Sequence, residues 1–203
     1  MTISPPRLRR PRPTHEIVDL FPARGDWTEE EYLALDTNRL VELSDGEVEM
    51  LEMPTIFHQI MVVRLITALD TFIVAHSLGQ ALVAPVRVRL GSGKYREPDL
   101  VFVAAAHLDR MGELSVSRPD LVVEVISPDD PQRDRMTKMQ EYAQAGISEY
   151  WLLDPSTATL EVYTLRHNAY TSTRRLRAGD ELTSDQLPGF TLAVADVFKP
   201  RAT

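Results

Sequence analysis

The chain has 203 residues, 43% of them hydrophobic and 26% charged, with a formal net charge of −8, which suits one globular domain with a full core. The net negative charge argues against electrostatic binding of nucleic acid over the whole surface. The lack of an uninterrupted apolar run of about 18 residues argues against a membrane-spanning helix or a membrane partner. The absence of cysteine excludes disulfides and thiolate metal sites and fits a cytoplasmic location.

Residues 1–25 are expected to form a flexible, basic, proline-rich arm ahead of a single domain over residues 26–200. The arm holds five of the fourteen prolines and shows little periodicity. Its arginines form either a solvated tail or a local contact with phosphate. These are Arg7, Arg9, Arg10 and Arg12, and a second basic cluster comprises Arg166, Arg174, Arg175 and Arg177.

The first half of the domain alternates helical and extended patterns. Residues 28–31, Thr-Glu-Glu-Glu, resemble a capping box and predict a short helix. An Asp-Gly step between the apolar runs 40–43 and 48–51 predicts a hairpin. Apolar residues then recur at spacings of three and four, which predicts a helix over 55–77. Alternation of apolar and arginine residues within 81–90 predicts a half-exposed strand.

The second half reads as strands with one helix between them. Apolar, β-branched runs at 98–104 and 120–127 predict two strands. A helical pattern follows and ends at Gly146, where glycine suits a left-handed cap. Further strands are expected over 149–153 and 160–165. This order predicts an α/β fold in which helices flank a mixed β-sheet.

Glu124 lies in the middle of the apolar run Leu-Val-Val-Glu-Val-Ile. A buried carboxylate needs a compensating partner. Asp99 begins the preceding strand, and if both side chains point to one face they can share Mg²⁺ or Mn²⁺, with a backbone carbonyl of Val125 or Ile126 completing the ligands. Such an ion polarises a scissile phosphate and lowers the pKa of a bound water.

Asp120 is the rival partner because it also follows a proline. It lies on the same strand as Glu124 and on the same face, but ~13 Å away along the strand. That separation is too large for one shared ion. We therefore expect Asp120 to begin its strand and Asp99 to bind the metal.

The motifs "EPDLVFV", "RPDLVVEVISP" and "EYAQAGISEYWLLDP", with the hairpin "VELSDGEVEMLEMPTIFHQ" and the ending "PGFTLAVADVF", resemble the Uma-two family of proteins described as restriction endonucleases. This family is a branch of the PD-(D/E)XK nuclease superfamily, and the resemblance covers about residues 27–198. It implies a restriction-endonuclease-like core with an N-terminal helix and hairpin, and metal-dependent hydrolysis of DNA. Asp99 matches the Pro-Asp aspartate and Glu124 the second-strand acid.

The superfamily lysine, expected two positions after the acid, is replaced by Ile126. The family pattern offers Lys138 in the following helix instead, with Tyr142 one turn later, and a long lysine stem can reach the same site from a helix. The alternative is a surface ion pair between Asp134 and Lys138 at i, i+4.

Two further residues are candidates for ancillary site roles. His58 lies at the first turn of the long helix, where the alternative is a core or capping role. Glu52, just before that helix, is either a second metal acid or a loop charge, and Glu97 is expected to be a similar bystander. Tyr150 and Trp151 are expected in the core, not as base-stacking platforms.

Two functions remain open. The first is a metal-dependent endonuclease with Asp99, Glu124 and Lys138 as catalytic residues and Asp99 and Glu124 as metal ligands. The second is a catalytically weak or inactive nuclease fold that acts as a DNA-binding or protein-interaction module, which the isoleucine at position 126 favours. Cleavage of both strands with one site per chain would suit a homodimer.

Overall fold

Two β-sheets organise the residues that the computed structural model describes, which are 26–37, 39–127 and 132–199. The larger sheet comprises β3 (Gly79–Val83), β6 (Leu100–Ala104), β8 (Leu121–Val125), β9 (Glu149–Asp154), β10 (Thr159–Arg166) and β11 (Ala169–Leu176). Its order is β11-β10-β9-β8-β6-β3, and only the β8–β9 pair is parallel. The predicted mixed sheet is therefore present.

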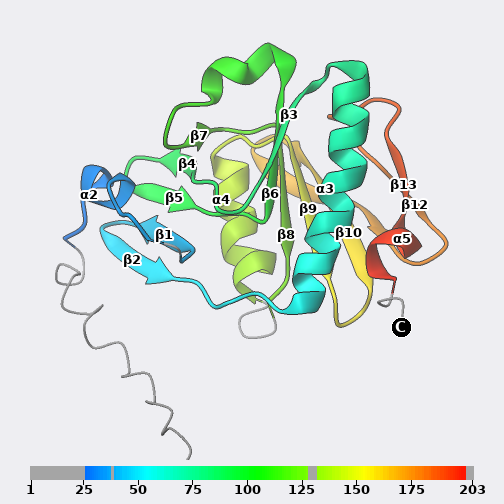
Figure 1. Ribbon diagram of the computed structural model, residues 1–203, viewed down its shortest axis with the longest axis horizontal. Helices are drawn as coiled ribbons and strands as arrows, with labels where there is room; N and C mark the ends of the chain where they lie inside the picture. Colours follow the sequence, from blue (N-terminus) through cyan, green and yellow to red (C-terminus); the bar gives the residue numbers. More distant parts are fainter. Residues whose placement is uncertain (1–25, 38, 128–131, 200–203) are drawn as a thin grey trace, which may run out of the picture.

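The smaller sheet extends from one end of the larger one (Figure 1). It comprises β1 (Val41–Ser44), β2 (Glu47–Met50), β4 (Val88–Gly91), β5 (Lys94–Arg96) and β7 (Val116–Ser117), in the order β2-β1-β5-β4-β7. A third, two-stranded unit pairs β12 (Glu181–Thr183) with β13 (Thr191–Ala193). The sequence predicts one mixed sheet, whereas the structure divides the strands among three.

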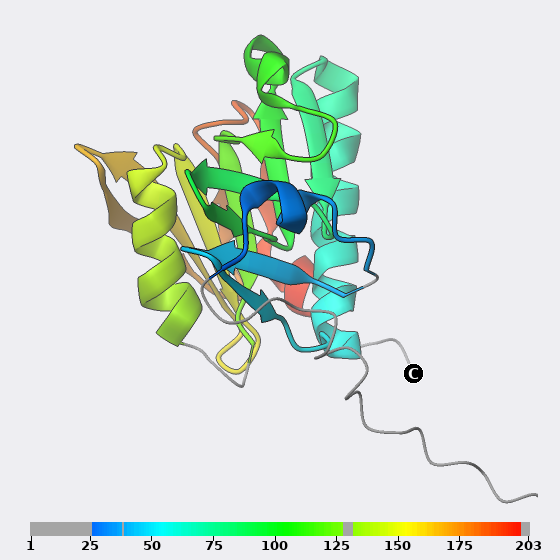
Figure 2. The ribbon, with the colours of Figure 1, turned by 90° about the vertical axis from the view of Figure 1, so that its left-hand side faces the viewer.

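Helices cover both faces of the larger sheet (Figures 1 and 2). On one face lies α3 (Ile56–His76), and on the other lies α4 (Met139–Gln144), which continues η2 (Arg133–Lys138), a π-helical turn. The remaining helices are α2 (Glu29–Leu33), η1 (Ala105–Arg110) and α5 (Val194–Phe198). Alternating strand residues explain the two cores: Leu100 and Val123 pack on the α3 side, whereas Val101 and Val122 pack on the α4 side.

Local chemistry accounts for the predicted elements. Thr28 and Glu31 form both hydrogen bonds of a capping box at α2. Asp45 and Gly46 adopt φ values of 53° and 83° in the β1–β2 turn, as a tight hairpin turn requires. The predicted cap at Gly146 is also confirmed, with φ at 76°.

The predicted single strand over 81–90 is wrong. Residues 79–83 form β3 at the edge of the larger sheet, and residues 88–91 form β4 in the smaller sheet. Pro85 lies between them and has no N–H to donate to a ladder, so the strand is interrupted there. The chain thereby passes from one sheet to the other.

One element of the described chain, α3, is long and apolar enough by length and composition to cross a membrane. Its buried residues include Met61, Leu65 and Leu69, which pack in the core against the larger sheet. The apolar character of α3 thus has an explanation within this fold. The predicted arm over residues 1–25 lies outside the described residues.

Candidate metal and lysine site

The structure brings Asp99 and Glu124 together at the end of β6. In the antiparallel ladder Leu100 pairs with Val123 and Val101 with Val122. Continuing this register by one residue places Asp99 opposite Glu124. Opposed residues of an antiparallel pair are close neighbours, but the two carboxylates have different surroundings. Glu124 contacts Lys138 and Tyr142 on the α4 side of the sheet, whereas the Asp99 carboxylate contacts His58 of α3.

Two contacts orient the Asp99 carboxylate. Its Oδ1 lies 2.7 Å from Nε2 of His58, which comes from the first turn of α3. Its Oδ2 accepts a hydrogen bond of 2.7 Å from the backbone N–H of Val125. The side chains of Asp99 and His58 are each 13% exposed, so the pair is partly accessible to solvent.

Glu124 is buried, and it is held by two donors from the opposite helix. Its Oε1 accepts from Lys138 Nζ over 2.9 Å and from the Tyr142 hydroxyl over 2.5 Å. Both of these donors contact the same carboxylate oxygen. Burial raises the pKa of Glu124 above its usual range, Lys138 opposes this effect, and Asp134 and Asp99 reinforce it.

Lys138 is buried in the site and is not part of a surface pair. Its Nζ lies 2.9 Å from Glu124, 3.3 Å from Asp134 and 3.5 Å from Glu42. The surface-pair interpretation is wrong because both Asp134 and Lys138 are buried. Burial acts to lower the pKa of Lys138, but the three carboxylates outweigh burial and raise it. The ammonium therefore stays charged.

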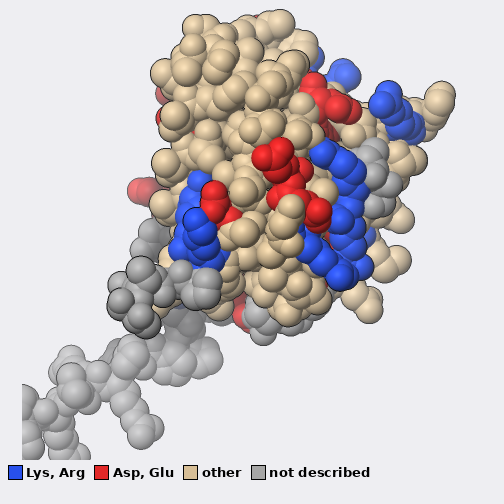
Figure 3. Space-filling model, turned by 90° about the vertical axis from the view of Figure 1, so that its right-hand side faces the viewer, with Lys and Arg blue, Asp and Glu red and all other residues tan. Residues whose placement is uncertain are grey.

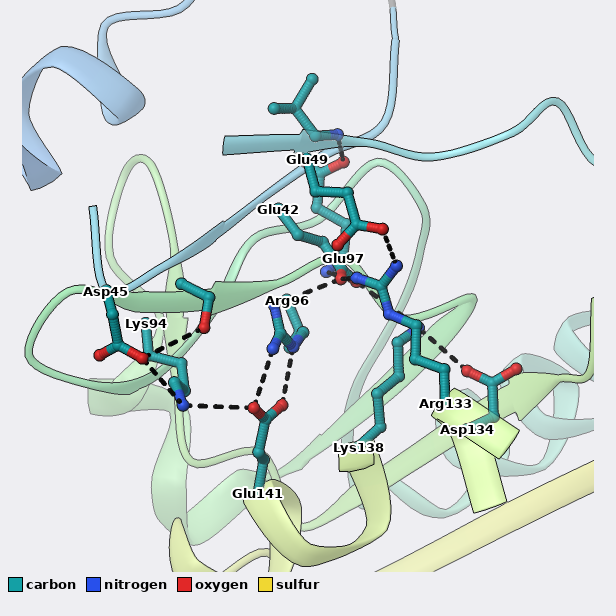
Figure 4. Close-up of polar contacts among 12 residues, drawn as sticks. Glu42, Asp45, Glu49, Lys94, Arg96, Glu97, Arg133, Asp134, Lys138 and Glu141 are labelled. Carbon is teal, nitrogen blue, oxygen red and sulfur yellow. Dashed lines mark hydrogen bonds and ion pairs between the residues drawn. The ribbon is translucent and has the colours of Figure 1, made fainter. Parts of the chain in front are cut away.

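Sequence analysis missed Glu42, which links the site to the smaller sheet (Figure 4). This residue of β1 is fully buried, and it contacts Arg96 and Arg133 as well as Lys138. Burial acts to raise the pKa of Glu42, but the three cations outweigh burial and lower it. Arg96 is in turn fixed by two hydrogen bonds of 2.8 Å to Glu141. A signal for Glu42 existed, because it interrupts an apolar run just as Glu124 does.

The other candidate acids differ from Asp99 and Glu124 in their burial and contacts. Glu52 is exposed between β2 and α3. Glu97 is buried and accepts from the Val41 N–H over 2.8 Å, so it is a structural residue and not a loop bystander. Asp120 lies at the opposite end of β8 from Glu124, where its carboxylate accepts from the backbone N–H of Ala104 over 2.8 Å.

The aromatic residues of β9 belong to the core as predicted. Tyr150 and Trp151 are both 0% exposed, so neither offers a face for stacking on a base. Ile126 is also buried in the core on the α4 side. The cation beside Glu124 comes instead from η2, as Lys138.

Two arginines of the second predicted basic cluster make contacts within the fold. Arg174 donates to Thr183, and Arg175 pairs with Glu161 at 3.3 Å. On the face that carries α3 and the β12–β13 unit, basic side chains lie in separate groups with acidic ones between them (Figure 3). The described residues form no continuous basic track for nucleic acid on this face.

The donor set fits a hard divalent cation. Asp99 and Glu124 supply carboxylate oxygens, the ligands that Mg²⁺ and Mn²⁺ prefer. Within the described ranges no group of three or more His, Cys, Asp or Glu residues forms a complete metal cluster. A site built on two carboxylates would therefore leave several positions for water or phosphate, as Mg²⁺ sites commonly do.

Comparisons with known proteins agree with this architecture. A crystal structure described as a putative nuclease belonging to DUF820, from Anabaena variabilis ATCC 29413, matches with a TM-score of 0.71 at 19% identity, covering 85% of this chain and 97% of that chain. That likeness shows the fold. No curated protein matches the chain. The model of the Uma2 (Uma-two) family, described as "Putative restriction endonuclease", matches residues 29–195, and the chain belongs to this family.

Proposed function

We propose that this chain is a metal-dependent endonuclease that hydrolyses phosphodiester bonds of DNA, with Mg²⁺ or Mn²⁺ as its cofactor. The observation that carries the proposal is the alignment of Asp99 and Glu124 across adjacent strands, with the Lys138 ammonium 2.9 Å from Glu124. Two carboxylates and a buried cation are the groups that phosphodiester hydrolysis requires at one place. Family membership supports the same class of reaction.

Each residue has a separate task in this proposal. Asp99 and Glu124 hold the metal, which when bound polarises the scissile phosphate. His58 and the Val125 N–H fix the direction of the Asp99 carboxylate. Lys138 holds a permanent positive charge beside the site, where it stabilises negative charge that develops on the phosphate and orients the attacking water.

The test uses Asp99 and Asp120, which each follow a proline, as a matched pair. Supercoiled plasmid is incubated with the protein and Mg²⁺ or Mn²⁺, and nicking is followed on a gel. Asp99→Asn and Lys138→Met are expected to lower the rate at least about 100-fold, because each removes a charged group from the site. Asp120→Asn changes an aspartate at the far end of β8 that is more deeply buried than Asp99, with side chains 4% and 13% exposed, and it is expected to keep activity once folding is verified.

Cleavage that survives Asp99→Asn unchanged would reject this site. A folded wild-type protein that binds DNA without cutting it, and that shows no heat of binding with Mn²⁺, would favour the DNA-binding or protein-interaction module instead. Cleavage of both strands would require two sites, which we propose a homodimer supplies. Light scattering on the protein in solution measures its mass directly.

A further inference from the structure

The Lys138 ammonium pairs with carboxylates from three separate elements. Glu124 comes from β8, Asp134 from the same π-helical turn as Lys138, and Glu42 from β1. The contact with Glu124 is the shortest, at 2.9 Å, against 3.3 Å to Asp134 and 3.5 Å to Glu42. The proposed function, however, asks Glu124 to serve a divalent cation.

That demand creates a competition for Glu124. A metal bound by its carboxylate weakens or replaces the 2.9 Å contact with Lys138, because two cations then share one carboxylate. A buried ammonium that lost an acceptor without compensation would be strongly unfavourable. Lys138 must therefore be retained by its other partners.

Glu42 is the partner that is fixed independently of Lys138. Its Oε2 lies 3.4 Å from Arg96 and also pairs with Arg133, and its Oε1 accepts from the Glu97 backbone N–H over 3.2 Å. Asp134, by contrast, lies on the same helical turn as Lys138, so its position is not independent of that of Lys138. Glu42 thus offers a stationary negative charge on the side of the smaller sheet (Figure 4).

We propose that Glu42 is a positioning residue for Lys138. Glu42 keeps the ammonium in the site when Glu124 binds a divalent cation. The proposal rests on the proposed nuclease function and adds a role for a residue of the hairpin. Without Glu42, Lys138 would depend more on Glu124 and would compete more strongly with the metal. The role is therefore visible in metal affinity, apart from any cleavage.

A double-mutant cycle tests this coupling. Calorimetric titration with Mn²⁺ at one fixed pH compares the wild type, Glu42→Gln, Lys138→Met and the double variant. We expect Lys138→Met to bind Mn²⁺ more tightly and Glu42→Gln to bind it at least about tenfold more weakly. In the Lys138→Met background the effect of Glu42→Gln should fall below about threefold, because the residue on which it acts is absent.

Glu141→Gln is the matched control. Glu141 pairs with Arg96 in the same network but makes no contact with Lys138 among the described residues. The affinity of the Glu141→Gln variant for Mn²⁺ should therefore stay within about threefold of that of the wild type. In plasmid cleavage Glu42→Gln should lower kcat more than it changes KM. If Glu42→Gln fails to fold, Glu42→Asp, which keeps the charge but withdraws it by one methylene, replaces it in the same cycle.

The outcomes separate the two proposals. Wild-type binding of Mn²⁺ with an equal effect of Glu42→Gln in both backgrounds overturns the positioning role and leaves the nuclease proposal standing. A Glu141→Gln effect as large as that of Glu42→Gln also overturns it. A wild-type protein that binds no Mn²⁺ overturns the metal-dependent function, and this inference fails with it.

Discussion

The hydroxyl of Tyr142 offers a measurement of the charge on Glu124. It donates to Oε1 over 2.5 Å, and Tyr142 is 0% exposed. The ring packs against that of Tyr150, with centroids 5.4 Å apart. Tyr142→Phe keeps the ring and its packing and removes the donor alone.

Tyr150→Phe is the matched comparison, because Tyr150 is equally buried and donates over 3.1 Å to a neutral acceptor, the backbone carbonyl of Asp134. A hydrogen bond to a charged group contributes about 1.5–3 kcal/mol, whereas one between neutral groups contributes about 0.5–1.5 kcal/mol. Because Lys138 continues to serve the same oxygen of Glu124, we expect Tyr142→Phe to lower the free energy of unfolding by about 2 kcal/mol and Tyr150→Phe by about 1 kcal/mol.

Urea unfolding followed by circular dichroism measures both losses. The assay is run at pH 9 without divalent cations, because burial raises the pKa of Glu124 to about 8 and the carboxylate must be ionised. Equal m-values would show that only stability has changed. A loss for Tyr142→Phe no larger than that for Tyr150→Phe would refute a charge-assisted bond to Glu124.

Three further changes test parts of the fold that support the site. The hydrogen bond from the Gly93 N–H is the main cause that lowers the pKa of Glu29 to about 2. The stability that this contributes is present above pH 4.5 and is lost as the pH falls toward 2. In urea unfolding, Glu29→Gln should therefore lower the free energy of unfolding by about 1 kcal/mol at pH 7, after solvent screening, and by nearly nothing at pH 2. Gly79→Ala should destabilise by more than about 1 kcal/mol in the same assay, because φ is +146° and an added Cβ would lie 2.1 Å from a carbonyl oxygen of the paired strand. Arg96→Lys breaks the bidentate pair with Glu141 and should lower the unfolding temperature by roughly 2–8 °C in calorimetry.

Features determined by neighbouring residues could be predicted from the sequence. The Asp-Gly step predicted the β1–β2 hairpin, and apolar periodicity predicted a helix over 55–77 within one residue of α3 at each end. The pairing of Asp99 with Glu124 was also accessible, because strand spacing excluded Asp120 as the partner. In each case the deciding interaction lies within an element or between strands that are adjacent in a sheet.

The second half of the site depends on contacts that no local pattern reveals. Glu42 and Arg133 are 91 positions apart in the chain, yet they pair in the site. Their contact requires the smaller sheet to pack against η2, and the sequence predicted a single sheet without that division. The same missing information left a surface i, i+4 pair open as an alternative to a site role for Lys138, because its contact with Glu42 of β1 joins residues that are distant in the chain.

The position of the lysine on η2 affects what holds the fold together. Lys138 joins β8, β1 and its own helical turn through three carboxylates. The charges proposed for chemistry are therefore also the polar contacts that unite the two sheets and the helix. A single substitution in this network affects stability and chemistry together, because removing one buried charge leaves its partners uncompensated. The two effects are separated only by comparing variants that lose the same amount of stability but differ in whether they change the chemistry.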